Sequence, residues 1–352
     1  MLMQRLVQLI NTKKDNAAIF FIVISKTLFF QVVKLEIIIT FATEFSKKNN
    51  RLKKMAFKAG FVNIVGNPNV GKSTLMNILV GEKLSIITAK SQTTRHRIMG
   101  VVTTDDYQIV YSDTPGVLKP VYKLQESMLN YSESALVDAD VVLYITDVLE
   151  TKTKNKFFLD MVNRLTCPVI ILINKIDLAQ SQEQVAEIIS EWKKLIPKAE
   201  IFPVSALHKF NTENILDKIV SLLPENPPYF EKDCLTDKSE RFFVSEIVRE
   251  KVLTHYEKEI PYSVEVQVES FKEETDIIRI QAVINVIRES QKGIIIGRQG
   301  QALKKLGSDA RKELEAFFGK KIYLEIFVKV SKDWRDNKNR LRGFGYDVTG
   351  MS

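Results

Sequence analysis

The chain has 352 residues, of which 45% are hydrophobic, so it is long enough to form two domains that each bury a core. Its net charge is +8, but the first 54 residues hold 10 Lys and Arg against 3 Asp and Glu, so most of the excess lies there. The overall charge is therefore no argument for nucleic-acid binding, and a basic surface must be sought locally. The two cysteines, Cys167 and Cys234, exclude a disulfide framework and favour a reducing cytoplasm.

The first 54 residues differ in composition from the rest, passing from an apolar stretch to a basic one. Lys26, Lys34 and Glu36 interrupt the apolar residues, so no run approaches the roughly 20 that a membrane span needs. No small-residue cleavage site of a signal peptide is evident. We expect residues 1–54 to be a spurious or disordered extension and translation to start at Met55. A membrane-attached extension is the alternative.

A short apolar strand is predicted at 60–65, followed at once by a glycine-rich loop and a helix over 74–79. The loop has the GxxxxGK[ST] pattern, which turns backbone N–H groups toward phosphates while the helix N-terminus adds positive potential. Lys72 is expected to reach the β- and γ-phosphates, and the Ser73 hydroxyl to ligate Mg²⁺. The predicted phosphate-binding residues are Gly66, Asn67, Pro68, Asn69, Val70, Gly71, Lys72 and Ser73.

Two further segments are expected to sense the terminal phosphate. A strand at 107–112 ends at Asp113-Thr114-Pro115-Gly116, where the aspartate can hold the Mg²⁺ shell and the glycine N–H can contact the γ-phosphate. Thr94, in the linker after the first helix, is expected to give Mg²⁺ its second hydroxyl, with an ordinary polar loop residue as the alternative. The predicted catalytic residues are Lys72, Thr94 and Gly116, and loss of the γ-phosphate should loosen both segments.

The next residue, Val117, is included in the predicted nucleotide-binding segment, although it raises a difficulty. Many GTPases place a glutamine there to orient the attacking water, which valine cannot do. No arginine finger is evident in the sequence either. Intrinsic hydrolysis should therefore be slow unless another group or a partner completes the site.

The base is expected to be read by Asn174-Lys175-Ile176-Asp177, which follows a buried strand at 169–173. The Asp177 carboxylate can accept from guanine N1–H and N2–H₂, whereas adenine offers no such pair of donors. Asn174 is expected to support the loop, and the stem of Lys175 to lie along the base. After another strand, Ser205 and Ala206 form the expected contact with guanine O6 through a backbone N–H, most simply that of Ala206.

Residues 222–239 are rich in proline and charge and are predicted to be a linker. Beyond them we predict a helix over about 241–256, a strand with alternating valines at 264–268 and a second strand over about 277–287. A Gly-x-x-Gly turn then joins two helices, a last strand follows at about 322–330, and a short basic helix ends the region. This order, α-β-β-α-α-β with such a turn, looks like a KH domain of the second topological type.

The turn has a physical use in binding RNA. Gly297 and Gly300 would let its backbone approach that of a nucleic acid, while Arg298 supplies charge. Residues 292–321 hold 8 Lys and Arg against 3 acidic residues, so the local charge is favourable, although a tight helix–helix corner is the alternative for the turn alone. Ile294 to Ile296 and the adjacent sheet are expected to form an apolar groove for unstacked bases, and a groove of this size suits a few single-stranded nucleotides. The predicted RNA-binding residues are Lys292, Ile295, Gly297, Arg298, Gln299, Gly300, Lys304 and Lys305.

Together these features resemble the bacterial Era family of GTPases, over about residues 59–346. The strings that carry the resemblance are the phosphate loop, Gln92 to Arg97, Asp113 to Gly116, Asn174 to Asp177, Arg241-Phe242 with Ser245 to Lys251, Pro261 to Val264 and the Gly297–Gly300 turn. The resemblance implies binding of the 3′ end of 16S ribosomal RNA and a role in maturation of the 30S subunit. It leaves open a peripheral association with the inner membrane, and a monomer is expected. The family also lacks the catalytic glutamine, in agreement with Val117.

The resemblance offers one candidate for the missing catalytic group. Some similar GTPases that lack the glutamine use an asparagine at the position of Asn69, with carbonyls of the segment around Thr94, to hold K⁺ against the phosphates. The alternative is that Asn69 braces the loop by bonding to its backbone. Both interpretations remain open.

We therefore expect a doubly wound α/β GTPase domain with a mostly parallel sheet at 56–224, a linker at 225–239, an α+β KH domain of type II at 240–337 and a tail at 338–352. GTP hydrolysis would time residence on the small subunit. One rival is a nucleotide-gated RNA-binding scaffold with negligible turnover, and another is a G protein tethered to the membrane through residues 1–54.

Overall fold

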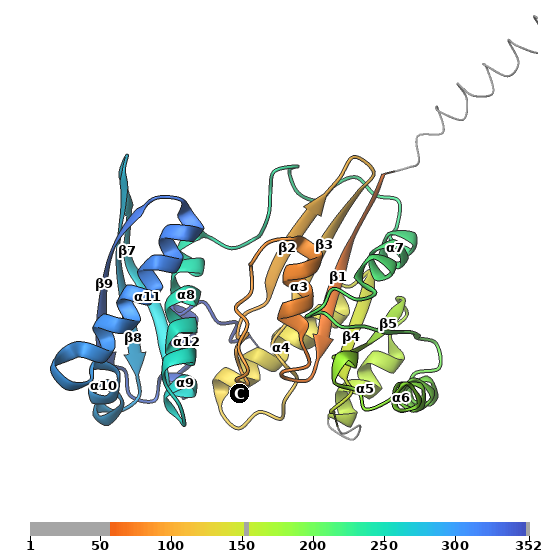
Figure 1. The fold of residues 1–352 in the computed structure, drawn as a ribbon, viewed down its shortest axis with the longest axis horizontal. Coiled ribbons are helices and arrows are strands. Elements are labelled where there is room, and N and C mark those ends of the chain that lie inside the picture. Colours follow the sequence, from red (N-terminus) through yellow and green to blue (C-terminus); the bar gives the residue numbers. More distant parts are fainter. Residues whose placement is uncertain (1–56, 151–154, 350–352) are drawn as a thin grey trace, which may run out of the picture. The chain divides into compact units, whose positions relative to one another are not determined.

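The computed structural model describes residues 57–150 and 155–349 (Figure 1). From Phe57 onward the chain forms one compact unit. The expectations for residues 1–54 lie outside the described residues. Cys167 and Cys234 are free thiols, as expected from their number and spacing.

The first region runs from β1 to α7. It is built on a six-stranded sheet in the order β2-β3-β1-β4-β5-β6. β2 pairs antiparallel with β3, and the other neighbours pair in parallel. The mostly parallel α/β fold predicted from the motifs is confirmed. The strands are β1 (Lys58–Gly66), β2 (Ile98–Thr103), β3 (Tyr107–Asp113), β4 (Val141–Asp147), β5 (Val169–Asn174) and β6 (Glu200–Pro203). The helices are α3 (Lys72–Val80), α4 (Lys123–Val137), α5 (Lys156–Arg164), α6 (Gln182–Leu195) and α7 (Thr212–Leu222).

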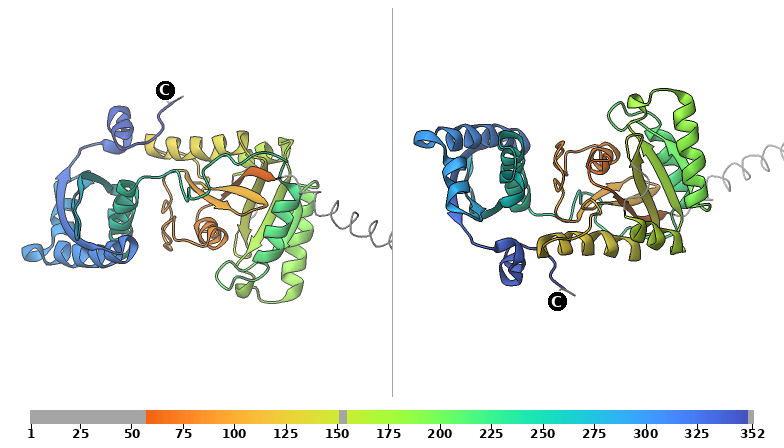
Figure 2. Two further views of the ribbon diagram at one scale, coloured as in Figure 1. Left: turned by 90° about the horizontal axis from the view of Figure 1, so that it is seen from above. Right: turned by 90° about the horizontal axis from the view of Figure 1, so that it is seen from below.

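Both faces of this sheet are covered by helices (Figure 2). One core joins α3 and α7 to the sheet, and the other joins α4, α5 and α6 to its opposite face. The central strands are consequently buried on both sides, which explains why they read as continuous apolar runs. β1 lies between β3 and β4, so the strand order reverses beside its carboxyl end, where ligands bind in open α/β sheets.

The segment between α7 and the second region, predicted as a linker, follows the edge of the sheet. Val101 N–H donates to the Leu235 carbonyl at 2.8 Å, and the Thr236 hydroxyl donates to the Met99 carbonyl at 2.6 Å. The Gln108 side chain donates to the Phe230 carbonyl at 2.9 Å. The bonds of Val101 and Met99 satisfy backbone groups on the edge strand β2, so the segment is ordered along the edge of the sheet.

The second region has the predicted order α-β-β-α-α-β around a three-stranded sheet, β7-β8-β9, in which β8 pairs antiparallel with β7 and parallel with β9. Its principal core packs α8 and α11 against the sheet. The strands are β7 (Glu265–Glu273), β8 (Ile277–Val286) and β9 (Lys321–Val330). The helices are α8 (Glu240–His255), the short α9 (Ile260–Ser263), α10 (Glu289–Ile296) and α11 (Gln301–Phe318), with the turn η2 (Arg298–Gly300) between the last two.

The chain beyond β9 returns to the first region. A short helix, α12 (Lys338–Gly343), was predicted there, and its Leu341 packs with Trp334 and Tyr346 against Leu124 and Met128 of α4. The described part of the predicted tail is thus a packed element.

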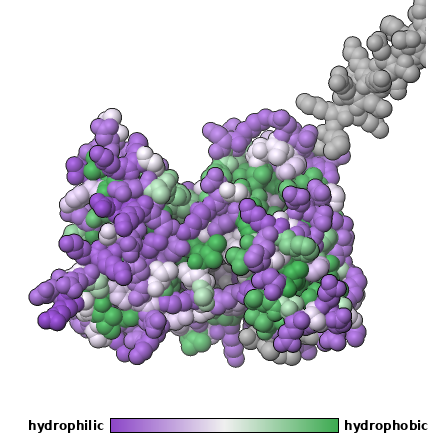
Figure 3. All heavy atoms as spheres, viewed as in Figure 1, coloured by the Kyte–Doolittle hydropathy of each residue, from purple (hydrophilic) through white to green (hydrophobic). Residues whose placement is uncertain are grey.

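No helix within 57–150 or 155–349 combines the length and apolar character needed to cross a membrane. The face drawn in Figure 3 is mainly hydrophilic, with hydrophobic residues in small groups between polar ones.

Candidate functional site

The glycine-rich loop lies between the end of β1 and the start of α3, and two of its glycines are sterically required. Gly66 has φ +148°, and a Cβ there would lie 2.2 Å from the Ile145 carbonyl oxygen. Gly71 has φ +100°, and a Cβ would lie 2.2 Å from Asn174 Nδ2. The loop can therefore pass this close to β4 and to the last residue of β5 because it lacks side chains there.

Lys72, the first residue of α3, is buried beneath the loop. Its ammonium donates to the carbonyls of Gly66 at 3.1 Å and Asn67 at 2.8 Å. Burial lowers the pKa of Lys72 to about 8, against the opposing charges of Asp113 and Glu150. A cation held this way is available to an anion bound in the loop.

Three oxygen-bearing side chains meet beside the loop. The Ser73 and Thr94 hydroxyls are 2.8 Å apart, and both bond to Asp113 Oδ2, at 2.7 and 3.3 Å. Asp113 Oδ1 is buried and, among the described residues, has no hydrogen-bond partner. Burial raises the pKa of the Asp113 carboxyl above its usual value, although the hydrogen bond from Ser73 opposes this shift. Two hydroxyls and an under-satisfied carboxylate are a donor set that suits Mg²⁺.

Asp113 to Gly116 begins the segment 113–122, which we call switch II. Gly116 packs directly on the loop, since a Cβ there would lie 2.7 Å from the backbone of Pro68. The N–H of Val117, the next residue, donates to the Gly66 carbonyl at 3.1 Å. Switch II therefore starts in contact with the phosphate loop.

Three residues of the predicted nucleotide-binding set turn their side chains away from the loop. Val70 and Val117 are buried in the two cores of the sheet. The Thr114 hydroxyl donates to the Ile64 carbonyl at 2.7 Å. Their side chains stabilise the fold, so the nucleotide contacts predicted for these three residues would be made by backbone groups, and they stay predictions.

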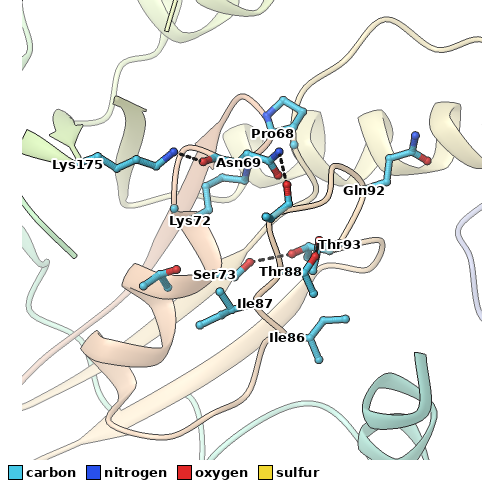
Figure 4. A pocket seen from close by; sticks show the side chains of 15 residues that line it. Pro68, Asn69, Lys72, Ser73, Ile86, Ile87, Thr88, Gln92, Thr93 and Lys175 are labelled. Atoms are coloured by element: carbon cyan, nitrogen blue, oxygen red, sulfur yellow. Dashed lines mark hydrogen bonds between the residues drawn. The ribbon is translucent and has the colours of Figure 1, made fainter. Parts of the chain in front are cut away.

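A cavity of about 390 Å³ lies between the loop and the segment 81–97, which we call switch I (Figure 4). Asn69 faces switch I across it, and its amide Nδ2 donates to the Ala89 carbonyl at 3.0 Å. Asn69 itself has φ 64°, a left-handed conformation that asparagine tolerates. The cavity is lined by Pro68, Asn69, Gly71 to Thr74, Ile86 to Ala89, Gln92 to Thr94, Gly116 and Lys175.

The residues predicted to read guanine lie at the carboxyl ends of β5 and β6. Asn174 Nδ2 donates to the Val70 carbonyl at 2.7 Å, which is the predicted support of the loop. Lys175 Nζ donates to the Asn69 carbonyl and to Asp147, both at 2.6 Å. Asp177 Oδ1 accepts from the Ser205 hydroxyl at 2.5 Å. The two sequence segments expected to read the base are thus joined directly.

Ala206 differs from its expected role. Its N–H donates to Asn174 Oδ1 at 2.9 Å. A contact between this N–H and guanine O6 therefore requires that bond to be shared or exchanged. The Ile176 N–H is likewise engaged, by the Val204 carbonyl at 3.2 Å.

The predicted RNA-binding turn is exposed at the junction of α10 and α11. Gly297 and Gly300 have φ of 70° and 75°, and Gln299 between them has φ 51°. A Cβ on Gly297 would lie 2.6 Å from Cβ of Ala302, so its glycine is required, whereas Gly300 has open space. Arg298, Gln299, Lys304 and Lys305 are exposed, and Lys292 is half-buried.

Ile295 requires a correction. Its side chain is fully buried in the core of the second region, and its carbonyl accepts from the Tyr256 hydroxyl at 2.8 Å. Its two neighbours are accessible instead, because Ile294 is 50% exposed and Ile296 lines a surface cavity.

The sequence predicted an apolar groove beside the turn but did not identify the residues of α11 and β9 that line it. A cavity of about 550 Å³ lies there, and the adjoining one of about 540 Å³ shares Leu303 and Ile326 with it. Helical spacing of three and four residues after Gly300 could have identified its α11 wall. The first cavity is lined by Gly300, Leu303, Lys304, Gly307, Ser308, Arg311, Ile322, Tyr323, Leu324 and Ile326.

Switch I also contacts the second region. Arg95 is fully buried, and its guanidinium donates to the Val264 carbonyl at 2.7 Å and to Glu265 at 3.0 Å. Lys90 donates to the carbonyls of Leu253 and Tyr256 at the end of α8. Nothing in the local sequence around Arg95 indicated these partners.

Comparison with known proteins gives consistent matches to both regions. A family model described as 50S ribosome-binding GTPase matches residues 61–175, and a KH domain model matches residues 259–335. GTPase Era of Caldanaerobacter subterraneus subsp. tengcongensis is 45% identical over 297 residues, which cover 84% of this chain and 99% of that protein.

Two solved structures are similar over the same part of the chain. One is Era in complex with MgGDPNP and nucleotides 1506–1542 of 16S ribosomal RNA, and the other is a variant of Aquifex aeolicus Era bound to GDP·AlF4⁻. Each has a TM-score of 0.80 and 40% identity, covering 83% of this chain and 100% of the other.

Proposed function

The chain belongs to the Era family of GTPases, and from that premise we propose that its GTP cycle controls binding to the 3′ end of 16S ribosomal RNA during maturation of the 30S subunit. The observation that carries the proposal is the meeting of Ser73, Thr94 and Asp113 beside the phosphate loop, in a chain that also carries a Gly-x-x-Gly groove. A relative with the same two regions has been solved with both a GTP analogue and this RNA.

We assign the chemistry of phosphoryl transfer to the phosphate loop and the two switches. Lys72 would stabilise the charge on the β- and γ-phosphates, and the Gly116 N–H would contact the γ-phosphate. Ser73, Thr94 and Asp113 would hold Mg²⁺, which supplies further positive charge to the transferring group. The buried Val117 side chain has no part in orienting water.

For the base, we propose that Asp177 accepts from the two guanine donors while Ser205 holds its carboxylate. The half-buried stem of Lys175, fixed by Asp147, would flank the ring. This arrangement explains a preference for guanine over adenine, since adenine lacks the donor pair that a carboxylate needs.

We further propose that K⁺ completes the catalytic site. The contact of the Asn69 amide with the Ala89 carbonyl supports this, because it brings an amide and a switch I carbonyl to the same side of the loop. Oxygen atoms of this kind suit a cation and would place positive charge where an arginine finger acts. The same hydrogen bond also fits the simpler bracing role of Asn69, and the comparison of salts in the Discussion separates the two.

For the RNA, we propose that the Gly297–Gly300 turn contacts the phosphate backbone and that the groove between α11 and β9 takes a few unpaired bases. Lys304 and Arg311 line that groove and supply charge, while Leu303 and Ile326 supply apolar walls. The nucleotide-binding part would be 56–224 and the RNA-binding part 240–337, acting in the cytoplasm as a monomer. A peripheral contact with the inner membrane is tested by fractionating cells.

The direct test is to crosslink the protein to RNA in cells and sequence the attached fragments. We expect the 3′ end of 16S ribosomal RNA to be enriched over other ribosomal sequences. Multiple-turnover phosphate release with and without 30S particles then separates a working GTPase from a scaffold. Turnover that is negligible in both conditions would favour the scaffold, and fragments without the 3′ end would refute the proposed RNA.

A further inference from the structure

Asn155, the residue before α5, makes contacts that a helix-capping asparagine ordinarily does not. Its backbone is left-handed, with φ 57° and ψ 45°, and its side chain makes no bond to its own helix. Asparagine at this position usually accepts a bond from the first turn of the helix. Here its amide Nδ2 instead donates to the Val117 carbonyl at 2.7 Å and to Asn67 Oδ1 at 2.6 Å.

These bonds belong to a hydrogen-bonded chain of side chains in which every donor faces an acceptor. The Thr146 hydroxyl donates to Glu150 at 2.6 Å, and Asn67 Nδ2 donates to the other oxygen of the same carboxylate. Asn67 therefore presents its carbonyl oxygen to Asn155, whose two N–H groups are both used. A carboxylate at position 155 could make neither bond.

The bond to Val117 matters because of where that residue lies. Its N–H is held by Gly66, and its carbonyl is held by Asn155, so the peptide groups on both sides of it are anchored. Gly116, which would contact the γ-phosphate, is the preceding residue and packs on Pro68. A cavity of about 590 Å³ borders this network and also Leu118 and Lys119, so switch II has room to shift once released.

We propose that Asn155 is a positioning residue for GTP hydrolysis, which holds the start of switch II against the phosphate loop so that the Gly116 N–H faces the γ-phosphate. Asn67 and Glu150 orient Asn155 for this task. Because the protein lacks the water-orienting glutamine, GTP hydrolysis depends more strongly on the position of the Gly116 N–H relative to the γ-phosphate. The inference rests on the proposed roles of Gly116 and the phosphate loop.

The test is Asn155→Asp, which is nearly isosteric and removes both donors. Single-turnover hydrolysis by the full chain saturated with GTP should fall by about tenfold, as expected for a displaced reacting geometry. Affinity for GDP should stay within a factor of about two, because GDP lacks the phosphate that Gly116 would contact. The ratio of affinities for a non-hydrolysable GTP analogue and GDP should fall several-fold. A purely structural role would lower both affinities together.

Asn211→Asp is the matched control. Asn211 precedes α7 with a left-handed backbone, φ 65° and ψ 13°, and its side chain likewise accepts no bond from a backbone N–H of the first turn, although its Oδ1 accepts from the Asn214 side-chain amide at 2.7 Å. Its amide donates to Pro203 and not to switch II. This variant introduces the same charge and loses a comparable bond, so it should hydrolyse GTP like the wild type. Wild-type hydrolysis measured beside it shows whether the GTPase itself is active, independently of the inference.

A double variant, Asn155→Asp with Glu150→Gln, keeps the proposal testable if the single variant folds poorly. The new glutamine can donate to Asn67, which can then turn its amide toward the new aspartate, so the side-chain network is repaired. The Val117 carbonyl still has no donor. We expect the melting temperature to recover while hydrolysis stays slow. Recovery of hydrolysis, or a single variant within a factor of about two of the wild type, would overturn the proposal.

Discussion

Arg249 of α8 donates a hydrogen bond from its guanidinium to the backbone carbonyl of Thr93, at 2.5 Å. Thr93 precedes Thr94, the proposed Mg²⁺ ligand. Arg249 is almost fully buried and is held by two bonds to Glu246, at 2.7 and 2.5 Å. The first helix of the second region is therefore in direct contact with switch I. A change in switch I that followed loss of the γ-phosphate would be felt by α8 through this bond.

Removing one member of this buried pair should strongly destabilise the protein. Arg249→Met leaves the Glu246 carboxylate buried without its partner, and we expect a loss of about 3–5 kcal/mol. Replacing both residues by apolar ones should restore most of that stability, since the pair itself contributes little once its desolvation is counted. Urea unfolding of the full chain measures both effects.

Lys320→Met is the control, because its ion pair with Glu273 is exposed and should be worth less than about 1 kcal/mol. If the double replacement of Arg249 and Glu246 were as unstable as the single one, the pair would have a stabilising role beyond mutual neutralisation.

The same pair predicts a loss of stability in acid. Burial alone would raise the pKa of Glu246, but the Arg249 charge outweighs it, with His96 and Arg95 also facing the carboxylate, so the pKa lies below its usual value. A group with a lowered folded pKa stabilises above its unfolded pKa and loses that contribution as the pH falls through the folded one. The stability of the wild type should therefore drop below about pH 4.5, and a Glu246→Gln variant should show a shallower slope there. Equal slopes in the two proteins would exclude Glu246 as a source of the acid sensitivity.

Asp177→Asn should weaken GTP binding by about 2–4 kcal/mol, because it removes a charged acceptor for two guanine donors. The affinity for xanthine nucleotides should rise relative to that for GTP, since their ring offers a hydrogen-bond acceptor to the N–H of the new amide. Titration with both triphosphates measures the exchange. An unchanged GTP affinity would refute the assignment of the guanine site.

Replacing Arg298 and Gln299 together by Asp should abolish binding to short single-stranded RNA, because both side chains are exposed on the turn and the new carboxylates would face phosphates. GTP hydrolysis without RNA should persist, as the phosphate loop lies in the other domain. Glu273→Gln, at an exposed position on β7, provides a surface control that should keep RNA affinity. If the aspartate variant still bound RNA, the Gly-x-x-Gly turn would be a structural corner.

Potassium should accelerate turnover several-fold over sodium at equal ionic strength, if Asn69 and the Ala89 carbonyl help to hold it. Asn69→Ala should remove the difference between the two salts while GTP still binds, because the phosphate loop keeps its glycines and Lys72. Steady-state phosphate release in KCl and NaCl provides the measurement. Equal rates in the two salts would leave Asn69 with the bracing bond that the structure shows and make a partner-supplied group the better explanation.

The motifs that carry the chemistry could be identified from the sequence because each is a run of adjacent residues whose function depends on spacing. The phosphate loop, Asp113 to Gly116 and Asn174 to Asp177 each follow a buried strand. The carboxyl ends of parallel strands lie at one edge of their sheet. A motif that follows each strand is therefore predicted to lie at that edge, and this is where Ser73 and Asp113 meet. The confirmed fold class follows from the same alternation of strands and helices.

Side-chain direction could not be derived in the same way. Three adjacent isoleucines, Ile294 to Ile296, have equal hydrophobicity, but successive helical positions point about 100° apart, so one faces the core and another faces solvent. Which of them is buried depends on how α10 packs against the rest of the domain, and this placed Ile295 in the core.

The contacts that join separate parts of the chain were decided by tertiary structure alone. Asn155 meets Val117 across 38 positions, Arg249 meets Thr93 across 156, and Arg95 meets Val264 across 169. Each is a bond to a backbone carbonyl, a group that every residue carries, so the sequence holds no mark of the partner. Such a bond is specified by the packing that places one donor beside one carbonyl and removes water from both.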